Sequence, residues 1–144
     1  MQVTKNNTVE MGDQKVVYKK EGDHAITCLA SDLESETIMA GTHAHHIIHY
    51  KLNSLPEQLK LLTAHENHYE TIVNTLDMMK TEDQSYFIAG HSNGLIKIFN
   101  CNTGAHLVDI QAHSRTVNAI VCHPSKPIFA SVSDDTFVNL WYCK

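Results

Sequence analysis

The sequence has no excess of positive charge, and this absence bears first on its partners. It carries 11 lysine and arginine residues against 16 aspartate and glutamate residues, a formal net charge of -5 over 144 residues. Proteins that bind the phosphate backbone of nucleic acids show a basic excess or a basic stripe, because cationic side chains supply their affinity. We therefore expect no nucleic-acid partner.

Long apolar runs are absent as well. No stretch approaches the roughly 18 to 20 apolar residues that a membrane-spanning helix needs. Residues 1–15 are polar and rich in turn formers, and they lack the apolar core of a secretory signal. The sequence thus predicts a polar tail, or the remnant of a preceding blade, at 1–15, no membrane span and a cytoplasmic protein.

The four cysteines form no C-x-x-C pair. They are Cys28, Cys101, Cys122 and Cys143, far apart along the chain. A zinc knuckle or a dithiol redox site needs closely spaced cysteines, so neither is indicated. We expect reduced thiols.

Sequence motifs for catalysis are missing too. The chain contains no G-x-S-x-G, P-loop, G-x-G-x-x-G or H-E-x-x-H pattern. The acidic pair Asp134-Asp135 falls in a predicted tight turn rather than a cleft. We expect a protein that is not an enzyme and that has no cofactor.

What the sequence does contain is clearest near its end. Three runs rich in β-branched or aromatic residues, Val117–Cys122, Ile128–Val132 and Phe137–Trp141, are separated by turn residues. Such runs favour strands, and short gaps between them favour hairpins. The stretch therefore predicts a three-stranded antiparallel meander.

Four residues in this stretch carry a family resemblance. His113 opens the unit, Ser131 lies in the second strand, Asp135 in the tight turn, and Trp141 closes it. Their order and spacing resemble a WD-type β-propeller repeat. The resemblance implies a buried hydrogen-bond relay among the four side chains, each of which would be costly to bury without a partner.

The same pattern recurs, more weakly, earlier in the chain. Closing aromatic residues fall at Tyr50, Phe99 and Trp141, at intervals of 49 and 42 residues, near the roughly 40 to 45 expected of this class. Only the last repeat keeps a full relay. Alanine stands at 40 and 89 where the last repeat has Ser131.

These repeats predict the fold and domain organisation. We expect an all-β partial β-propeller of three WD-type repeats in antiparallel four-stranded blades, at about 16–50, 59–99 and 107–143 within residues 16–144. Three repeats are too few to close a ring of roughly 4 to 8 blades. The arc stays open unless another chain or further sequence completes it, so its edges invite self-association, for example by a Val16–Tyr18 strand pairing with the sheet that ends at Trp141.

Histidine is the one compositional oddity, with 11 residues, four of them in THAHHIIHY at 42–50. His43, His45 and His49 share one face if this stretch is a strand, and an H-x-H pair can chelate zinc. No cysteine or acidic residue lies nearby in sequence to complete a shell. A metal-binding protein or metal-dependent enzyme is therefore the alternative function.

In a propeller, the loops before the first strands and the turns between the second and third strands share one rim. The histidines placed there are His24, His43, His45, His46, His65, His68 and His91. The resemblance implies an interaction face on this rim, and histidine also titrates near cellular pH. The favoured function is a non-catalytic scaffold that binds protein or peptide partners through its rim loops.

Overall fold

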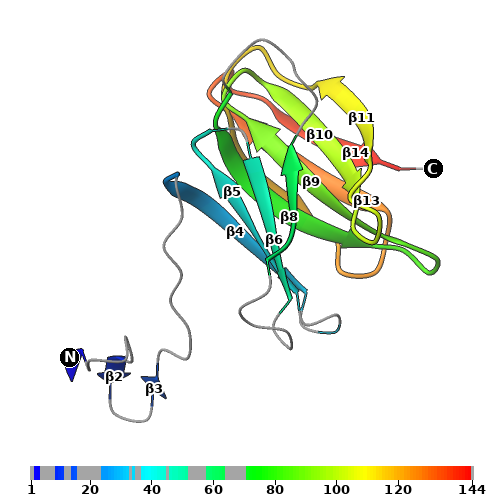
Figure 1. Cartoon of the computed structure of the whole chain (residues 1–144). Coiled ribbons are helices and arrows are strands. Elements are labelled where there is room, and N and C mark those ends of the chain that lie inside the picture. The colour runs from blue at the N-terminus through cyan, green and yellow to red at the C-terminus, as the bar shows by residue number, and fades with distance from the viewer. Residues whose placement is uncertain are drawn as a thin grey trace.

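The chain is all-β in the residues that its computed structural model describes, which are 24–32, 34, 37–44, 46–51, 58–63 and 71–143 with three short strands before them (Figure 1). Those strands are β1 (Gln2–Val3), β2 (Val9–Met11) and β3 (Gln14–Lys15), paired in that order. Within the described residues, no helix is long and apolar enough to cross a membrane.

Three antiparallel sheets follow, each formed by strands that neighbour one another in sequence. The first contains β4 (Ile26–Asp32), β5 (Thr37–Thr42), β6 (His46–Lys51) and β7 (Gln58–Thr63). The second contains β8 (Val73–Lys80), β9 (Ser85–His91), β10 (Leu95–Asn100) and β11 (His106–Gln111). The third contains β12 (Val117–Cys122), β13 (Ile128–Ser133) and β14 (Val138–Tyr142).

The prediction of an all-β chain of short antiparallel strands is confirmed. The longest strand, β8, extends to Lys80, where Met79 is buried and Lys80 still pairs with Ser85. The predicted strand Val16–Tyr18 lies outside the described residues.

The last strand of each complete sheet comes from the connection to the next one. β7 and β11 lead into the second and third sheets along the chain, yet they pair with β6 and β10. Each complete sheet is thus closed by a strand that the repeat pattern assigns to the following unit. The third sheet has three strands among the described residues.

An identical irregularity marks the first strand of every sheet. The pairing shifts register between Ile26 and Cys28, between Val73 and Thr75, and between Val117 and Ala119. Each shift inserts one extra residue, as a β-bulge does, and bends the strand locally. The three bulges therefore align the sheets residue by residue.

Apolar side chains fill the two spaces between neighbouring sheets. The first core joins Met39 and Ile47 to Val73, Leu76 and Phe87, and the second joins the other face of the second sheet to the third. Stacked aromatic pairs cross β9 to β10 and β13 to β14: ring centroids lie 4.8 Å apart for Phe87 and Phe99, and 5.9 Å for Phe129 and Trp141.

Two glycines set how closely the sheets approach. A Cβ atom on Gly41 would lie 2.7 Å from Cγ1 of Val73, and one on Gly90 would lie 2.7 Å from Cγ1 of Val117. Each valine of a following sheet therefore enters a notch above a glycine. Any side chain at either glycine would push the sheets apart.

Side chains also tie the inner strands to one another. Thr27 donates its hydroxyl proton to the carbonyl of Val73, Thr75 Oγ1 accepts from the N–H of Ile120 at 3.1 Å, and Asp77 Oδ2 accepts from the N–H of Cys122 at 2.6 Å. Residue numbers rise together in both pairs of strands, from 75–120 to 77–122 for β8 and β12, and from 27–73 to the ion pair 32–80 for β4 and β8, so the three strands run in the same direction. Their first residues therefore gather at one end of the assembly and their last residues at the other.

Candidate functional site

The third sheet joins four polar side chains into one hydrogen-bonded chain. His113 Nδ1 lies 2.9 Å from Asp135 Oδ2, and His113 Nε2 lies 2.8 Å from Ser131 Oγ. Trp141 Nε1 lies 2.9 Å from the same Ser131 oxygen. The structure thus brings all four relay residues together and links the loop before β12 to β13 and β14.

The hydrogen bonds of this relay all run in one direction, from the Trp141 indole to the Asp135 carboxylate. The indole N–H of Trp141 can only donate, so Ser131 Oγ accepts from it and turns its own proton to His113 Nε2. His113 then carries its proton on Nδ1 and donates to Asp135. His113 and Ser131 are both buried, so the relay connects loop to strand away from solvent.

Asp135 also shapes the turn between β13 and β14. Its carboxylate accepts hydrogen bonds from the backbone N–H groups of Phe137 at 3.0 Å and Ser114 at 3.0 Å. Burial would raise the pKa of Asp135, but these two N–H groups and the His113 ring outweigh it and hold the pKa below its usual value. The carboxylate is therefore ionised at neutral pH.

The second sheet keeps only part of this arrangement. Asn93 Oδ1 accepts from the N–H of Leu95 at 3.2 Å, as Asp135 does from Phe137, but alanine replaces the serine at 89. A different bond connects the preceding loop to the sheet, because Thr71 Oγ1 lies 3.2 Å from Nδ1 of the buried His91.

The first sheet uses a threonine instead. The buried Thr42 donates its hydroxyl proton to the carbonyl of His46 at 2.9 Å and accepts from the N–H of His46 at 3.0 Å. This closes the turn before β6 with neutral groups. The turn bonds described for the second and first sheets therefore involve Asn93 and Thr42 in place of a carboxylate.

The predicted interaction rim is only partly exposed where it is described. His24 and His43 are exposed, and the His24 and His46 rings lie 5.4 Å apart between centroids. His91 differs from the expectation: it is fully buried, because the last residue of β9 faces the first sheet rather than solvent. The other predicted rim residues, His45, His65 and His68, lie outside the described residues.

The proposed metal trio is not assembled by the described residues. His43 occupies the turn before β6, while His49 lies within β6, half-buried, with its Nε2 atom lacking a hydrogen-bond partner there. Burial lowers the pKa of His49. Among the described side chains, no three His, Cys, Asp or Glu gather closely enough to hold a metal ion; His45 is not among them.

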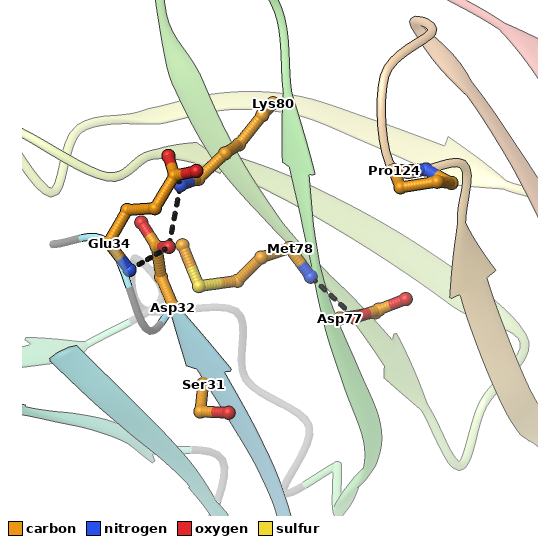
Figure 2. A pocket seen from close by; sticks show the side chains of 7 residues that line it. All are labelled: Ser31, Asp32, Glu34, Asp77, Met78, Lys80 and Pro124. Carbon is orange, nitrogen blue, oxygen red and sulfur yellow. Dashed lines mark hydrogen bonds and ion pairs between the residues drawn. The ribbon is translucent and has the colours of Figure 1, made fainter. Parts of the chain in front are cut away.

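A cavity lies at the opposite end of the inner strands, where β4, β8 and β12 finish (Figure 2). Its volume is about 300 Å³, and its lining comes from all three sheets. The lining residues are Ser31, Asp32, Glu34, Asp77, Met78, Lys80 and Pro124. No sequence motif marks these positions, and residue patterns do not predict the cavity because its parts are far apart along the chain.

Charged groups dominate one wall of the cavity. Lys80 Nζ lies 2.6 Å from Asp32 Oδ1 and 2.7 Å from Glu34 Oε2. Figure 2 shows the end of the Lys80 side chain beside these two carboxylates. Hydrogen bonds to Asp32 and then Glu34 raise the pKa of Lys80. Asp32 is buried whereas Glu34 is exposed, so the pair joins the first and second sheets at the edge of a solvent-accessible hollow.

The thiols are poorly suited to nucleophilic chemistry. Burial raises the pKa of Cys101 to about 12, and it also raises those of Cys28, Cys122 and Cys143. A thiol is reactive only as the thiolate, so these four cysteines are inert at neutral pH.

Comparison with known proteins identifies the last repeat. Residues 104–142 match the family described as WD domain, G-beta repeat. The chain is 38% identical over 58 residues to WD repeat-containing protein 54 of Mus musculus, and 36% identical over 58 residues to WD repeat domain 54 of Rattus norvegicus. Each match covers 40% of this chain and 17% of the relative, so the chain spans only a small part of these proteins.

Solved structures show the same fold over most of the chain. The structure titled "Crystal structure of RRP9 WD40 repeats" aligns with a TM-score of 0.73 at 22% identity, over 85% of this chain and 36% of that one. "Structure of U3-55K" gives 0.73 at 21% identity, over 85% and 37%. The prediction of an open arc of propeller blades is confirmed. Residues 104–142 thus match a WD repeat, and the described sheets have the fold of three neighbouring blades of a β-propeller.

Proposed function

We propose that the chain is a non-catalytic scaffold that binds protein or peptide partners through the rim on which its relay ends. The observation that carries this proposal is that the WD-type relay is shielded from solvent: His113 and Ser131 are buried, and with Asp135 they bond to one another and to backbone. A site so satisfied fixes loops in place and leaves them available for contact.

The exposed parts of that rim supply the contact surface. His24 and His43 are exposed and lie on the loop and turn that meet there, joined by the hydrogen bond from His43 N–H to the Ala25 carbonyl at 2.9 Å. Rigid loops that present polar, apolar and aromatic groups bind peptides at low entropic cost. The rim offers such loops above a stiff β framework.

Selection from a peptide library on the immobilised chain tests this function. Selected peptides should bind at least about tenfold more weakly to a His24→Ala and His43→Ala double variant, a loss of about 1.4 kcal/mol. The matched control is Glu34→Gln at the opposite end, which should bind them as the wild type does. Peptides that distinguish Glu34→Gln and ignore the rim variant would place the binding surface at the cavity of Figure 2 instead.

The metal alternative has its own measurement. The buried Nε2 of His49, which has no hydrogen-bond partner among the described residues, is the observation that favours it. Mass spectrometry of chain purified without a histidine tag should then find stoichiometric zinc or copper that is lost on His49→Ala. We expect no such metal, because no group of three His, Cys, Asp or Glu side chains that could hold a metal ion is found among the described residues.

We also propose a cytoplasmic location, on the basis of four free, half-buried cysteines. A fluorescent fusion of the chain should distribute through the cytoplasm. Retention in a secretory compartment would contradict this proposal.

A further inference from the structure

The contact between the first and second sheets contains a histidine where the next contact has an isoleucine. His49 pairs with Met39 in the first sheet as Ile98 pairs with Ile88 in the second, and each partner lies two residues before the glycine that receives a valine. Paired residues point to the same side of a sheet, and Met39 lies in the core between the first and second sheets. His49 therefore faces the second sheet, whereas Ile98 lies in the core between the second and third sheets.

The surroundings of His49 suit an uncharged ring. Its Nε2 atom is buried and has no hydrogen-bond partner among the described residues, and its cross-strand neighbours are Met39 and Lys60 rather than a carboxylate. A neutral imidazole can carry its proton on Nδ1, but an imidazolium has an N–H on both nitrogens. Protonation would therefore bury a charged donor without an acceptor, which is costly. Burial correspondingly lowers the pKa of His49.

The carboxylates that the described strands present to this contact already have cationic partners. Asp32 Oδ1 lies 2.6 Å from Lys80 Nζ, and Asp109 Oδ1 lies 2.7 Å from His106 Nε2 and 3.8 Å from Nζ of the buried Lys97. The other titratable side chains described there are those of the buried His91 and of Cys28 and Cys101. A protonated His49 would thus add a cation to a contact whose acidic groups are already paired.

The direction of the pH effect follows from the lowered pKa of His49. When the two sheets separate, the ring reaches water and its pKa returns to an ordinary value of about 6.5. The separated state then binds more protons than the packed state, so acid favours separation. The contact is therefore stable above about pH 6.5 and weakens as the pH falls below that value.

We propose that the contact between the first and second sheets is a pH-sensitive joint, which is closed at neutral pH and weakens when His49 gains a proton, while the contact between the second and third sheets does not respond. The loop and the turn that carry His24 and His43 belong to the first sheet. Protonation at the joint would thus change the rim as well. The inference goes beyond the proposed binding function, and its test needs no binding partner.

The cysteines provide a separate reporter for each contact. Cys28 and Cys101 pack against the core between the first and second sheets, and Cys122 and Cys143 pack against the core between the second and third. A dipyridyl disulfide reagent labels thiols at acid pH, and mass spectrometry of peptides measures each labelling rate. Dividing each rate by that of the urea-unfolded chain at the same pH gives the protection of each thiol.

The protection of Cys28 and Cys101 should fall at least about threefold between about pH 7.5 and about pH 5.5, relative to that of the other two thiols. His49→Ile places at this position the residue type found in the next contact and should abolish the fall. His49→Gln should abolish it too, because glutamine cannot be protonated. Urea midpoints at about pH 7.5 identify the variants that fold, and either variant alone is sufficient for the test.

His123→Asn is the matched control. It removes a histidine beyond β12, in the third sheet, and asparagine can replace the ring nitrogen that accepts from the N–H of Ser125 at 3.1 Å. This variant should keep the full acid response of Cys28 and Cys101. An equal fall in protection at both contacts would overturn the proposal, as would an acid response that persists after His49 is replaced.

Discussion

The second and third sheets share a bulge, a register and a stacked aromatic pair, but they fix their turns by different chemistry. The third sheet uses the ionised Asp135 and a buried imidazole, while the second uses Asn93 and the bond between Thr71 and His91. The first three strands of both sheets nevertheless pair in the same order, each with the next along the chain. Apolar packing therefore determines the architecture, and the relay additionally stabilises the turn and the preceding loop of the third sheet.

The largest loss of stability is expected from a core substitution, and it tests whether apolar packing contributes more than the relay. Phe87→Ala should cost about 3 to 5 kcal/mol in the free energy of unfolding, because it leaves a cavity in a sheet covered on both faces. Phe129→Ala should cost less, since the open face of the third sheet lets neighbours relax into the space. Urea unfolding of both variants measures the difference. An equal or greater loss for Phe129→Ala would contradict this view.

Removing the relay should have the next largest effect. His113→Ala leaves the buried Ser131 hydroxyl and the Asp135 carboxylate without a shared partner, so we expect a loss of about 1 to 3 kcal/mol. Thr71→Val, which breaks the corresponding link in the second sheet, should cost only about 0.5 to 1.5 kcal/mol. The same urea series decides the order of the two.

The pH dependence of stability distinguishes the relay of the third sheet, which contains Asp135, from the bond between Thr71 and His91 in the second sheet. Because the pKa of Asp135 is lower in the folded than in the unfolded chain, its contribution is present above the unfolded value of about 3.9 and is lost as the pH falls through the folded pKa. Asp135→Asn should therefore flatten the fall in urea midpoint below about pH 4. Asp134→Asn removes a charge from the same turn without contacting His113, and serves as its matched control.

A smaller effect is expected at the cavity. Lys80→Gln breaks the bridge to Asp32 and Glu34, and because Lys80 is partly exposed the loss should be about 0 to 1 kcal/mol. It should shrink further at high salt, which screens exposed charges. A loss of stability that does not change with salt would contradict this expectation, because it would mean that the bond between Lys80 and the buried Asp32 is shielded from solvent.

The smallest effect is expected on the rim. His43→Ala removes an exposed turn residue and should change stability by no more than about 0.5 kcal/mol. Thermal melts of this variant beside His113→Ala compare a surface histidine with a buried one. If His43→Ala proved the more damaging, the distinction between structural and surface histidines would be wrong.

The sequence allowed the strands to be predicted where β-branched runs end in turn residues, as at Val117–Cys122, whose bounds match β12. It also pointed to the closing aromatic residues, because their spacing repeats. The burial of His91 could not be predicted, since it depends on which neighbouring sheet faces the end of β9. The cavity could not be predicted either, because Asp32 and Lys80 come together only when the first and second sheets pack.

The pairing of β7 with β6 and of β11 with β10, across the connections between units, has a consequence for synthesis on the ribosome. When β4, β5 and β6 have emerged, the edge of β6 still awaits a strand that comes from the connection to the next unit. Neither complete sheet can gain its fourth strand before that connection has emerged. We therefore expect a cut in either connection to disturb two neighbouring sheets rather than one.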